Sequence, residues 1–442
     1  MEIKGRRWNM RQPKRRTSPL KLLLLILVVA FLVYVNITIE PLAPTLFLPS
    51  PTPTISPEIY IAEAEEMASQ GKYSMALQAY DKAILADPQN PSNYIASARL
   101  NVYAGNYNQA IKNASNAVLL DQNNSMGEAI KGFAHGLQGD YLDSESSLNR
   151  SIELDPGNST AYAYLSIMLS NKILIGDEVL GDLDKSIEAS RTAESIAPTS
   201  LESHWARGTV LEITGNYEEA IAELEQAVAV NSNIAQLHIT LGNNYKSLLE
   251  YNKAVEEYTR ANALNPSDSY PEWLISRTYA GIGEFGRAIQ YAEQAVSDDP
   301  ENPHLYGNLG SMYYRNYDYG RAILMLKLAI RGGNNPEGVA VEGLPLAYGR
   351  VVEYYYNYAF ALSELGYCEE AKIISQSILQ SAAEDLDAVF NANTIINRCN
   401  QKINDLQLLK LPEPTMIPTW TPQPSPTPTQ APTLIPTQTI LP

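Results

Sequence analysis

Small and apolar residues recur along most of this chain at spacings of three, four and seven, the period of a helix with one buried face. The segments GNYNQAIKNASNAV at 105–118 and GNYEEAIAELEQAV at 215–228 repeat nearly the same pattern more than 100 positions apart. A small residue marks each copy, at Ala76, Ala110, Ser144, Ser186, Ala220, Ala254, Ala288, Ala322 and Ala371. Six of the eight intervals are 34 residues long, which indicates a repeated structural unit.

Each unit predicts two antiparallel helices joined by a tight turn. A glycine usually precedes the second helix, where a positive φ is convenient, at Gly71, Gly105, Gly139, Gly215, Gly283 and Gly366. A proline after Asp or Asn often ends that helix, as at Pro88 and Pro266. One pair cannot bury its apolar face alone, so we expect an all-α solenoid of about nine stacked helix-turn-helix units over residues 57–385.

This pattern resembles the tetratricopeptide repeat family. The segment LGNNYKSLLEYNKAVEEYTRANALNPSD at 241–268 places the family's pattern residues at Leu241, Gly242, Tyr245, Tyr251, Ala254, Tyr258, Ala261 and Pro266. The first four units are degenerate, with Ser144 and Ser186 in place of the small alanine. The resemblance implies a protein-binding scaffold whose first helices line a concave groove.

Two features follow from the same pattern near its end. Residues 386–410 form an unpaired helical pattern, which predicts a capping helix on the last unit. Residues 336–350 are an insertion before the ninth unit, and Leu344-Pro345 is compatible with the start of a lengthened first helix there.

The N-terminal region differs from the rest in its apolar run. Residues 20–39 are long and apolar enough to predict a transmembrane helix acting as a signal anchor, after a basic cytoplasmic leader at 1–19. The alternative is a cleaved signal peptide and a secreted protein. Residues 40–56 and 411–442 are rich in proline and threonine, which predicts a linker and a disordered tail in extended, polyproline-like conformations.

Charge and motif content narrow the function. The net charge is −17, and residues 41–442 alone carry −23, which argues against nucleic-acid binding. The sequence shows no phosphate loop, zinc-protease motif or nucleophile elbow, so we expect no enzyme, no cofactor and no metal. His204 and His238 occupy matching points of adjacent units, for which a packing role is favoured over metal binding.

Residues at three recurring positions of the first helices are expected to face the groove. Aromatic, Arg and Asn side chains together suit an extended peptide, and packing between first helices is the alternative. The candidates are Trp205, Thr209, Ile239, Asn243, Trp273, Arg277, Asn308, Tyr356 and Asn357.

The chain has two cysteines, Cys368 and Cys399. If the cap packs antiparallel to the last second helix, these residues come together, and an external location would permit a disulfide. The alternative is two buried thiols.

These observations predict a membrane-anchored, non-enzymatic scaffold that binds a protein or peptide partner outside the cytoplasmic membrane. A structural spacer or envelope-assembly element, and an adaptor with cytoplasmic orientation, are the alternatives.

Overall fold

A computed structural model describes residues 19–39 and 56–409. The predicted leader up to residue 18, the linker at 40–55 and the tail at 411–442 lie outside the described residues. The chain divides into two compact units, 1–56 and 57–442, which we describe separately.

The first unit contains one helix, α1 (Pro19–Ile39). Its apolar side chains from Leu23 to Tyr34 are exposed. Among the residues that the structure describes, no helix combines the length and the apolar character that a bilayer crossing requires. The transmembrane helix predicted at 20–39 is therefore not supported.

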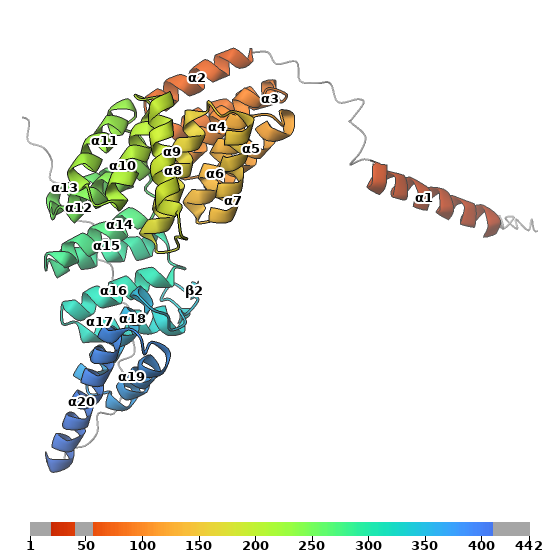
Figure 1. The fold of residues 1–442 in the computed structure, drawn as a ribbon. Coiled ribbons are helices and arrows are strands. Elements are labelled where there is room, and N and C mark those ends of the chain that lie inside the picture. The colour runs from red at the N-terminus through yellow and green to blue at the C-terminus, as the bar shows by residue number, and fades with distance from the viewer. Residues whose placement is uncertain (1–18, 40–55, 410–442) are drawn as a thin grey trace, which may run out of the picture. The chain divides into compact units, whose positions relative to one another are not determined.

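The second unit is a stack of helix pairs in chain order, as the sequence predicts for an all-α solenoid (Figure 1). The first helices of the pairs are α2 (Pro57–Ser69), α4 (Pro91–Tyr103), α6 (Ser125–Gln138), α8 (Ser159–Leu174), α10 (Leu201–Ile213), α12 (Ala235–Ser247), α14 (Tyr270–Gly281), α16 (Pro303–Arg315) and α18 (Arg350–Glu364). The second helices are α3 (Tyr73–Ala86), α5 (Tyr107–Leu120), α7 (Tyr141–Leu154), α9 (Asp182–Ile196), α11 (Tyr217–Val230), α13 (Tyr251–Leu264), α15 (Phe285–Asp298), α17 (Tyr319–Arg331) and α19 (Cys368–Ser381). An unpaired helix, α20 (Leu386–Leu409), packs against α19 and α18.

The insertion before the last pair does not lengthen α18. Two short strands form an antiparallel hairpin here: β1 (Gly333–Asn334), just before the insertion, and β2 (Ala340–Val341), within it. Gly333 lies opposite Val341. The Leu344 backbone amide donates to the Ala329 carbonyl at 2.9 Å, and the Tyr355 hydroxyl donates to the Leu344 carbonyl at 2.8 Å. These bonds hold the insertion against α17 and α18, so helix α18 begins only at Arg350.

The turn inside each pair has one residue with a positive φ, five positions before the small residue of the second helix. Seven pairs have glycine there, whereas Leu249 and Tyr317 take φ values of 63° and 62° at the equivalent points. In the Gly71, Gly105, Gly139 and Gly215 turns the next residue donates its amide to a carbonyl five residues earlier, which closes the end of the first helix.

Close approach of the two helices in a pair depends on a small residue in the first helix. A Cβ built on Gly132 would lie 2.7 Å from Leu148 Cγ and 2.9 Å from the Ser144 carbonyl oxygen. Equivalent contacts face Gly208, Gly242 and Gly310, from Leu224, Tyr258 and Leu326 respectively. The glycine therefore lets the large side chain of the second helix pack directly on the backbone of the first.

The early pairs wind tightly, so that inner helices of different pairs meet. Phe133 on α6 stacks on Tyr164 on α8 with ring centroids 3.9 Å apart. Trp205 on α10 packs edge-on against Phe133, with centroids 5.5 Å apart. These three side chains have at most 1% of their surface exposed, and they fill the centre of the winding with aromatic core.

Candidate functional site

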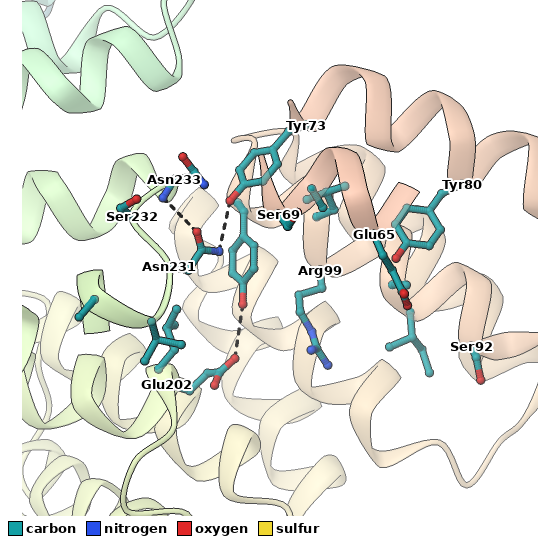
Figure 2. A pocket seen from close by; sticks show the side chains of 18 residues that line it. Glu65, Ser69, Tyr73, Tyr80, Ser92, Arg99, Glu202, Asn231, Ser232 and Asn233 are labelled. Carbon is teal, nitrogen blue, oxygen red and sulfur yellow. Dashed lines mark hydrogen bonds between the residues drawn. The ribbon is translucent and has the colours of Figure 1, made fainter. Parts of the chain in front are cut away.

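A cavity of about 790 Å³ lies where the winding brings the first two pairs against the fifth (Figure 2). Asn231 donates from its side-chain amide to the Tyr73 hydroxyl at 3.3 Å, and the Tyr103 hydroxyl donates to Glu202 at 3.4 Å. Both bonds cross between chain segments about a hundred or more residues apart, and both are dashed in Figure 2. They tie the two walls of the cavity together.

Arg99 extends into this cavity between Glu202 on one side and Glu65 on the other (Figure 2). Its buried Nε has no hydrogen-bond partner among the described residues. Burial lowers the pKa of Arg99, but the nearby Tyr164, Tyr103 and Glu202 outweigh it, so the pKa is raised overall. One cation and two carboxylates thus line the cavity, which leaves no excess positive charge to attract an anion.

Five of the predicted groove residues are buried in the structure, where they pack against other parts of the chain. Trp205 and Thr209 are each 1% exposed because the winding closes on them, and Ile239 is 3% exposed. The side-chain amides of Asn308 and Asn357 donate to Ser276 and Ser311 on the preceding first helices, at 3.1 and 3.0 Å. These residues pack the first helices together, which is the alternative that the sequence left open.

Trp273 and Arg277 remain partly accessible on α14. The Trp273 ring stacks on Tyr270 with centroids 5.4 Å apart. The Arg277 guanidinium lies 5.2 Å from the Trp273 ring centroid, and the Arg350 guanidinium lies 5.8 Å from it. Both distances are within the range of cation–π attraction, so the ring is held between two cations.

Four successive first helices each contribute one basic side chain to a group whose charges influence one another, and two of the four contact this ring. We call them the inner cationic cluster: Lys246 on α12, Arg277 on α14, Arg315 on α16 and Arg350 on α18. Glu353 accepts from Arg315 at 3.2 Å and from Arg350 at 3.3 Å, so its carboxylate bridges two of the four. Lys246 and Arg277 form no ion pair with any described residue.

The electrostatic environment of these two unpaired cations is unfavourable for charge. Burial, followed by the charge of Arg350, lowers the pKa of Arg277 to about 10. Burial and the charges of Arg277 and Arg350 lower the pKa of Lys246. The folded chain therefore holds two cations that are partly desolvated and repel each other, and neither is bonded to a carboxylate, although the nearby Glu353 offsets part of the cost for Arg277.

Two further predicted residues lie near this cluster or on its flank. Asn243 on α12 is half-buried, and its side-chain oxygen accepts from the Tyr258 hydroxyl at 2.8 Å. Tyr356 is half-buried and lines a cavity of about 280 Å³ with Arg350, Asp385 and Asp387. The structure thus places Trp273 and Arg277 together and leaves Asn243 and Tyr356 partly accessible.

Both histidines singled out in the sequence contact glutamates of their own pair. His204 Nδ1 lies 2.7 Å from Glu223, and His238 Nδ1 lies 2.6 Å from Glu257. The described residues contain no group of three His, Cys, Asp or Glu side chains placed to hold a metal. Each histidine links the first helix of its pair to the second.

The structure places Cys368 and Cys399 in a disulfide with their Cα atoms 5.2 Å apart. Cys368 begins α19 and Cys399 lies inside α20, so the bridge joins the cap to the last pair. Both residues are buried.

Sequence reasoning missed Lys246, Arg315, Arg350 and Glu353. A signal for them exists in the distribution of charge between helices. Helices α12, α14 and α16 carry three Lys or Arg residues against one acidic residue, Glu272, in a chain of net charge −17. Which of these cations would lack a partner depends on the winding, which the repeat period does not specify.

Comparisons with known protein families find matches in the later repeats. Models of the tetratricopeptide repeat family match residues 201–234, 235–268 and 274–336, which include helices α10 to α17. These matches cover 131 of the 442 residues, so similarity to the tetratricopeptide repeat is found in the later part of the stack. A comparison with curated proteins finds no match.

Three solved structures illustrate what the chain is similar to. The crystal structure of MamA protein is 24% identical, with 41% of this chain and 94% of that chain covered and a TM-score of 0.28. Pseudomonas aeruginosa pilF is 17% identical over 47% of this chain and 91% of that chain, with a TM-score of 0.37. A tetratricopeptide repeat protein from Parabacteroides merdae is 13% identical over 57% of this chain and 97% of that chain, with a TM-score of 0.36.

Proposed function

We propose that the chain is a non-enzymatic scaffold that binds a protein partner on the inner surface of its later repeats, at Trp273 and the inner cationic cluster. The observation that carries this proposal is the state of Arg277 and Lys246: partly buried, mutually repelling and unpaired. Proteins seldom keep desolvated charges without a counter-charge, because the charged form is disfavoured by burial. A partner that supplied the counter-charge would relieve this cost.

The aromatic residue supports the same surface. Trp273 is partly accessible, rigidly held by Tyr270 and flanked by two guanidinium groups. Tryptophan and arginine are the residue types most enriched among binding hot spots. The early repeats offer no equivalent surface, because Phe133, Tyr164 and Trp205 are buried against one another.

Two substitutions test this proposal against a partner captured in cells. A photo-crosslinking residue at the exposed position 316, next to Arg315 at the rim of the cluster, would trap the partner while all four cations stay in place. Adding Trp273→Ala is expected to reduce the trapped amount about tenfold or more, since loss of a hot spot costs about 1–2 kcal/mol. Undiminished trapping by a variant with unchanged circular dichroism would refute the site.

The matched control uses a cation outside the cluster. Arg287 on α15 is exposed, pairs with Glu284 at 3.0 Å and also lies over a tyrosine ring. Arg287→Ala is expected to leave trapping unchanged. An equal loss in both variants would favour a non-specific effect of charge, and trapping of nothing at all would favour the structural-spacer alternative.

We also propose, from the sequence, that residues 20–39 attach the chain to a membrane with the repeats on the outer side. Support comes from the apolar run between Leu22 and Val35 and the eight basic residues in the first 40 positions. Comparing membrane fractions of chains with and without residues 1–56 tests attachment. Protease added to intact cells separates the outer orientation from a cytoplasmic one, and the mass of the mature chain tests signal cleavage.

A further inference from the structure

The inner cationic cluster indicates what kind of partner segment it takes. We propose that it binds an acidic segment of a partner protein, with Asp or Glu carboxylates seated on Arg277 and Lys246. This inference rests on the proposed function, because it names the partner chemistry of the same surface.

Charge complementarity carries the first step. The cluster has four cations, and Glu353 is the carboxylate that bridges two of them, Arg315 and Arg350. Asp385 and Asp387 line a neighbouring cavity together with Arg350 and Glu353. Arg277 and Lys246 form no ion pair among the described residues, so an incoming anion meets two cations that are not bonded to a carboxylate.

Geometry carries the second step. The Arg277 and Arg350 guanidinium groups both lie within 6 Å of the Trp273 ring centroid, at 5.2 and 5.8 Å, and Glu353 links Arg350 to Arg315, so these side chains form one compact group and not a line along the solenoid. A compact group matches two or three carboxylates that are close together in sequence. A guanidinium group donates two parallel hydrogen bonds to a carboxylate, and the partly accessible Trp273 side chain lies beside Arg277 for an apolar neighbour.

The net negative charge of the rest of the chain favours a short acidic segment over a long polyanion such as a nucleic acid. Residues 41–442 carry a net charge of −23. A nucleic acid extends its charge over many tens of ångströms and would meet this acidic body, whereas a short acidic segment meets only the cluster. The Arg99 cavity shows the contrast, since Glu65 and Glu202 already offset its single cation.

The test uses the full chain and three labelled decapeptides with acetylated and amidated ends. The first carries two Glu-Glu pairs flanking a Leu, with Gly and Ser elsewhere; the others replace the four Glu by Gln or by Lys. We expect the Glu peptide to bind, the Gln peptide to bind at least tenfold more weakly, and the Lys peptide not to bind. The affinity for the Glu peptide should also fall as salt rises.

Variants then locate the binding. Arg277→Gln and Lys246→Gln should each weaken the Glu peptide about tenfold, while Arg287→Gln and Lys253→Gln, which remove exposed cations paired with Glu284 and Glu250, should not. Arg277→Glu should reverse the preference and admit the Lys peptide. A purely structural role for Arg277 would not produce this reversal.

Each contrary result has a distinct meaning. Equal binding of the Glu and Gln peptides, or of neither, while trapping at position 316 still depends on Trp273, would overturn the acidic-segment inference and leave the proposed function standing. Loss of the Trp273 dependence would overturn the proposed function itself. Binding of inorganic phosphate in place of the Glu peptide, or self-association abolished by Arg277→Gln, would also overturn the inference.

Discussion

At the scale of single residues, burial separates side chains that sequence position treats alike. Trp205 and Trp273 occupy the same point of their units, 15 residues before Ala220 and Ala288. Trp205 is 1% exposed against Phe133, whereas Trp273 keeps an accessible face beside Arg277. The same position of the repeat is therefore buried in the core of one unit and accessible at the surface of another.

Trp205→Ala is accordingly expected to lower the free energy of unfolding by about 3–5 kcal/mol, because it removes a fully buried aromatic side chain and leaves a cavity. Trp273→Ala is expected to cost clearly less, since part of its ring already faces solvent. Urea denaturation followed by circular dichroism measures both. Equal losses would show that Trp273 is as much a core residue as Trp205.

Glu272 gives the chain a pH-dependent stability. It is 2% exposed, one of its oxygens has no partner among the described residues, and burial together with Asp298 raises its pKa to about 7. The folded state therefore keeps a proton that the unfolded chain releases at lower pH, so this contribution is complete at acidic pH and is lost as the pH rises through about 7.

Glu272→Gln should raise the free energy of unfolding at pH 8 by about 1–3 kcal/mol and flatten its decline between pH 5 and pH 8. Exposed Glu284 provides the control, and Glu284→Gln should change stability by less than about 0.5 kcal/mol. Denaturant melts across this pH range measure the effect. An unchanged slope in Glu272→Gln would contradict the assignment.

At the scale of the helix pair, the turn shows how far sequence rules reach. The recurring glycine predicted a positive φ, and the structure has one there in every described pair. In two pairs the repeat imposes the same conformation on Leu249 and Tyr317, where the left-handed region is unfavourable for a side chain. The stacking of the helix pairs therefore imposes a positive φ even where the local residue disfavours it.

Leu249→Gly should therefore raise the free energy of unfolding by about 0.5–1 kcal/mol, because the strain exceeds the entropy that glycine adds to the unfolded chain. The Leu249 side chain is 68% exposed, so little packing is lost. Gly283→Leu, at the equivalent turn of the next pair, should lower stability by a similar amount. Thermal unfolding of the three chains tests this, and a lower midpoint for Leu249→Gly would contradict it.

The contact inside each pair is equally testable. Gly132→Ala should destabilise the chain by about 1–3 kcal/mol, because its Cβ would lie 2.9 Å from a backbone carbonyl that cannot move aside. Gly286 lies in helix α15 with nothing within 4 Å of a Cβ, so Gly286→Ala should be neutral or stabilising. The two variants differ in how closely another atom approaches the added Cβ. Equal effects in denaturant melts would contradict the view that glycine permits the close approach of the two helices in a pair.

At the scale of the whole solenoid, the sequence predicted the stack but not its radius. The period of 34 and the position of the small residues were enough for the helix pairs, the turns and the cap helix. The contacts of Tyr73 with Asn231 and of Tyr103 with Glu202 join segments far apart in sequence, and no local pattern encodes them. The winding of the stack decides which inner faces are buried. The sequence alone therefore could not tell which of the predicted groove residues stay accessible.

The bridge between Cys368 and Cys399 acts at the end of the stack, where the single helix α20 covers the last pair. It closes a loop with a sequence separation of 31, which corresponds to about 3–4 kcal/mol in the chain-entropy description. Cys399→Ser should lower the unfolding free energy and speed proteolysis within α20. Titration of the unreduced, denatured protein should find no free thiol, and two free thiols would show that the bridge is absent.

The central claim is that partners bind the inner surface of the later repeats, and a crosslinking scan along the solenoid tests it most directly. Photo-crosslinking residues would be placed at the exposed position 316 beside the cluster, at 69 and 92 in the Arg99 cavity, and at the exposed outer positions Leu119 and Ile373. The account predicts one partner trapped from 316 and none from the other four positions. Trapping of that partner chiefly from the cavity or the outer helices would contradict it.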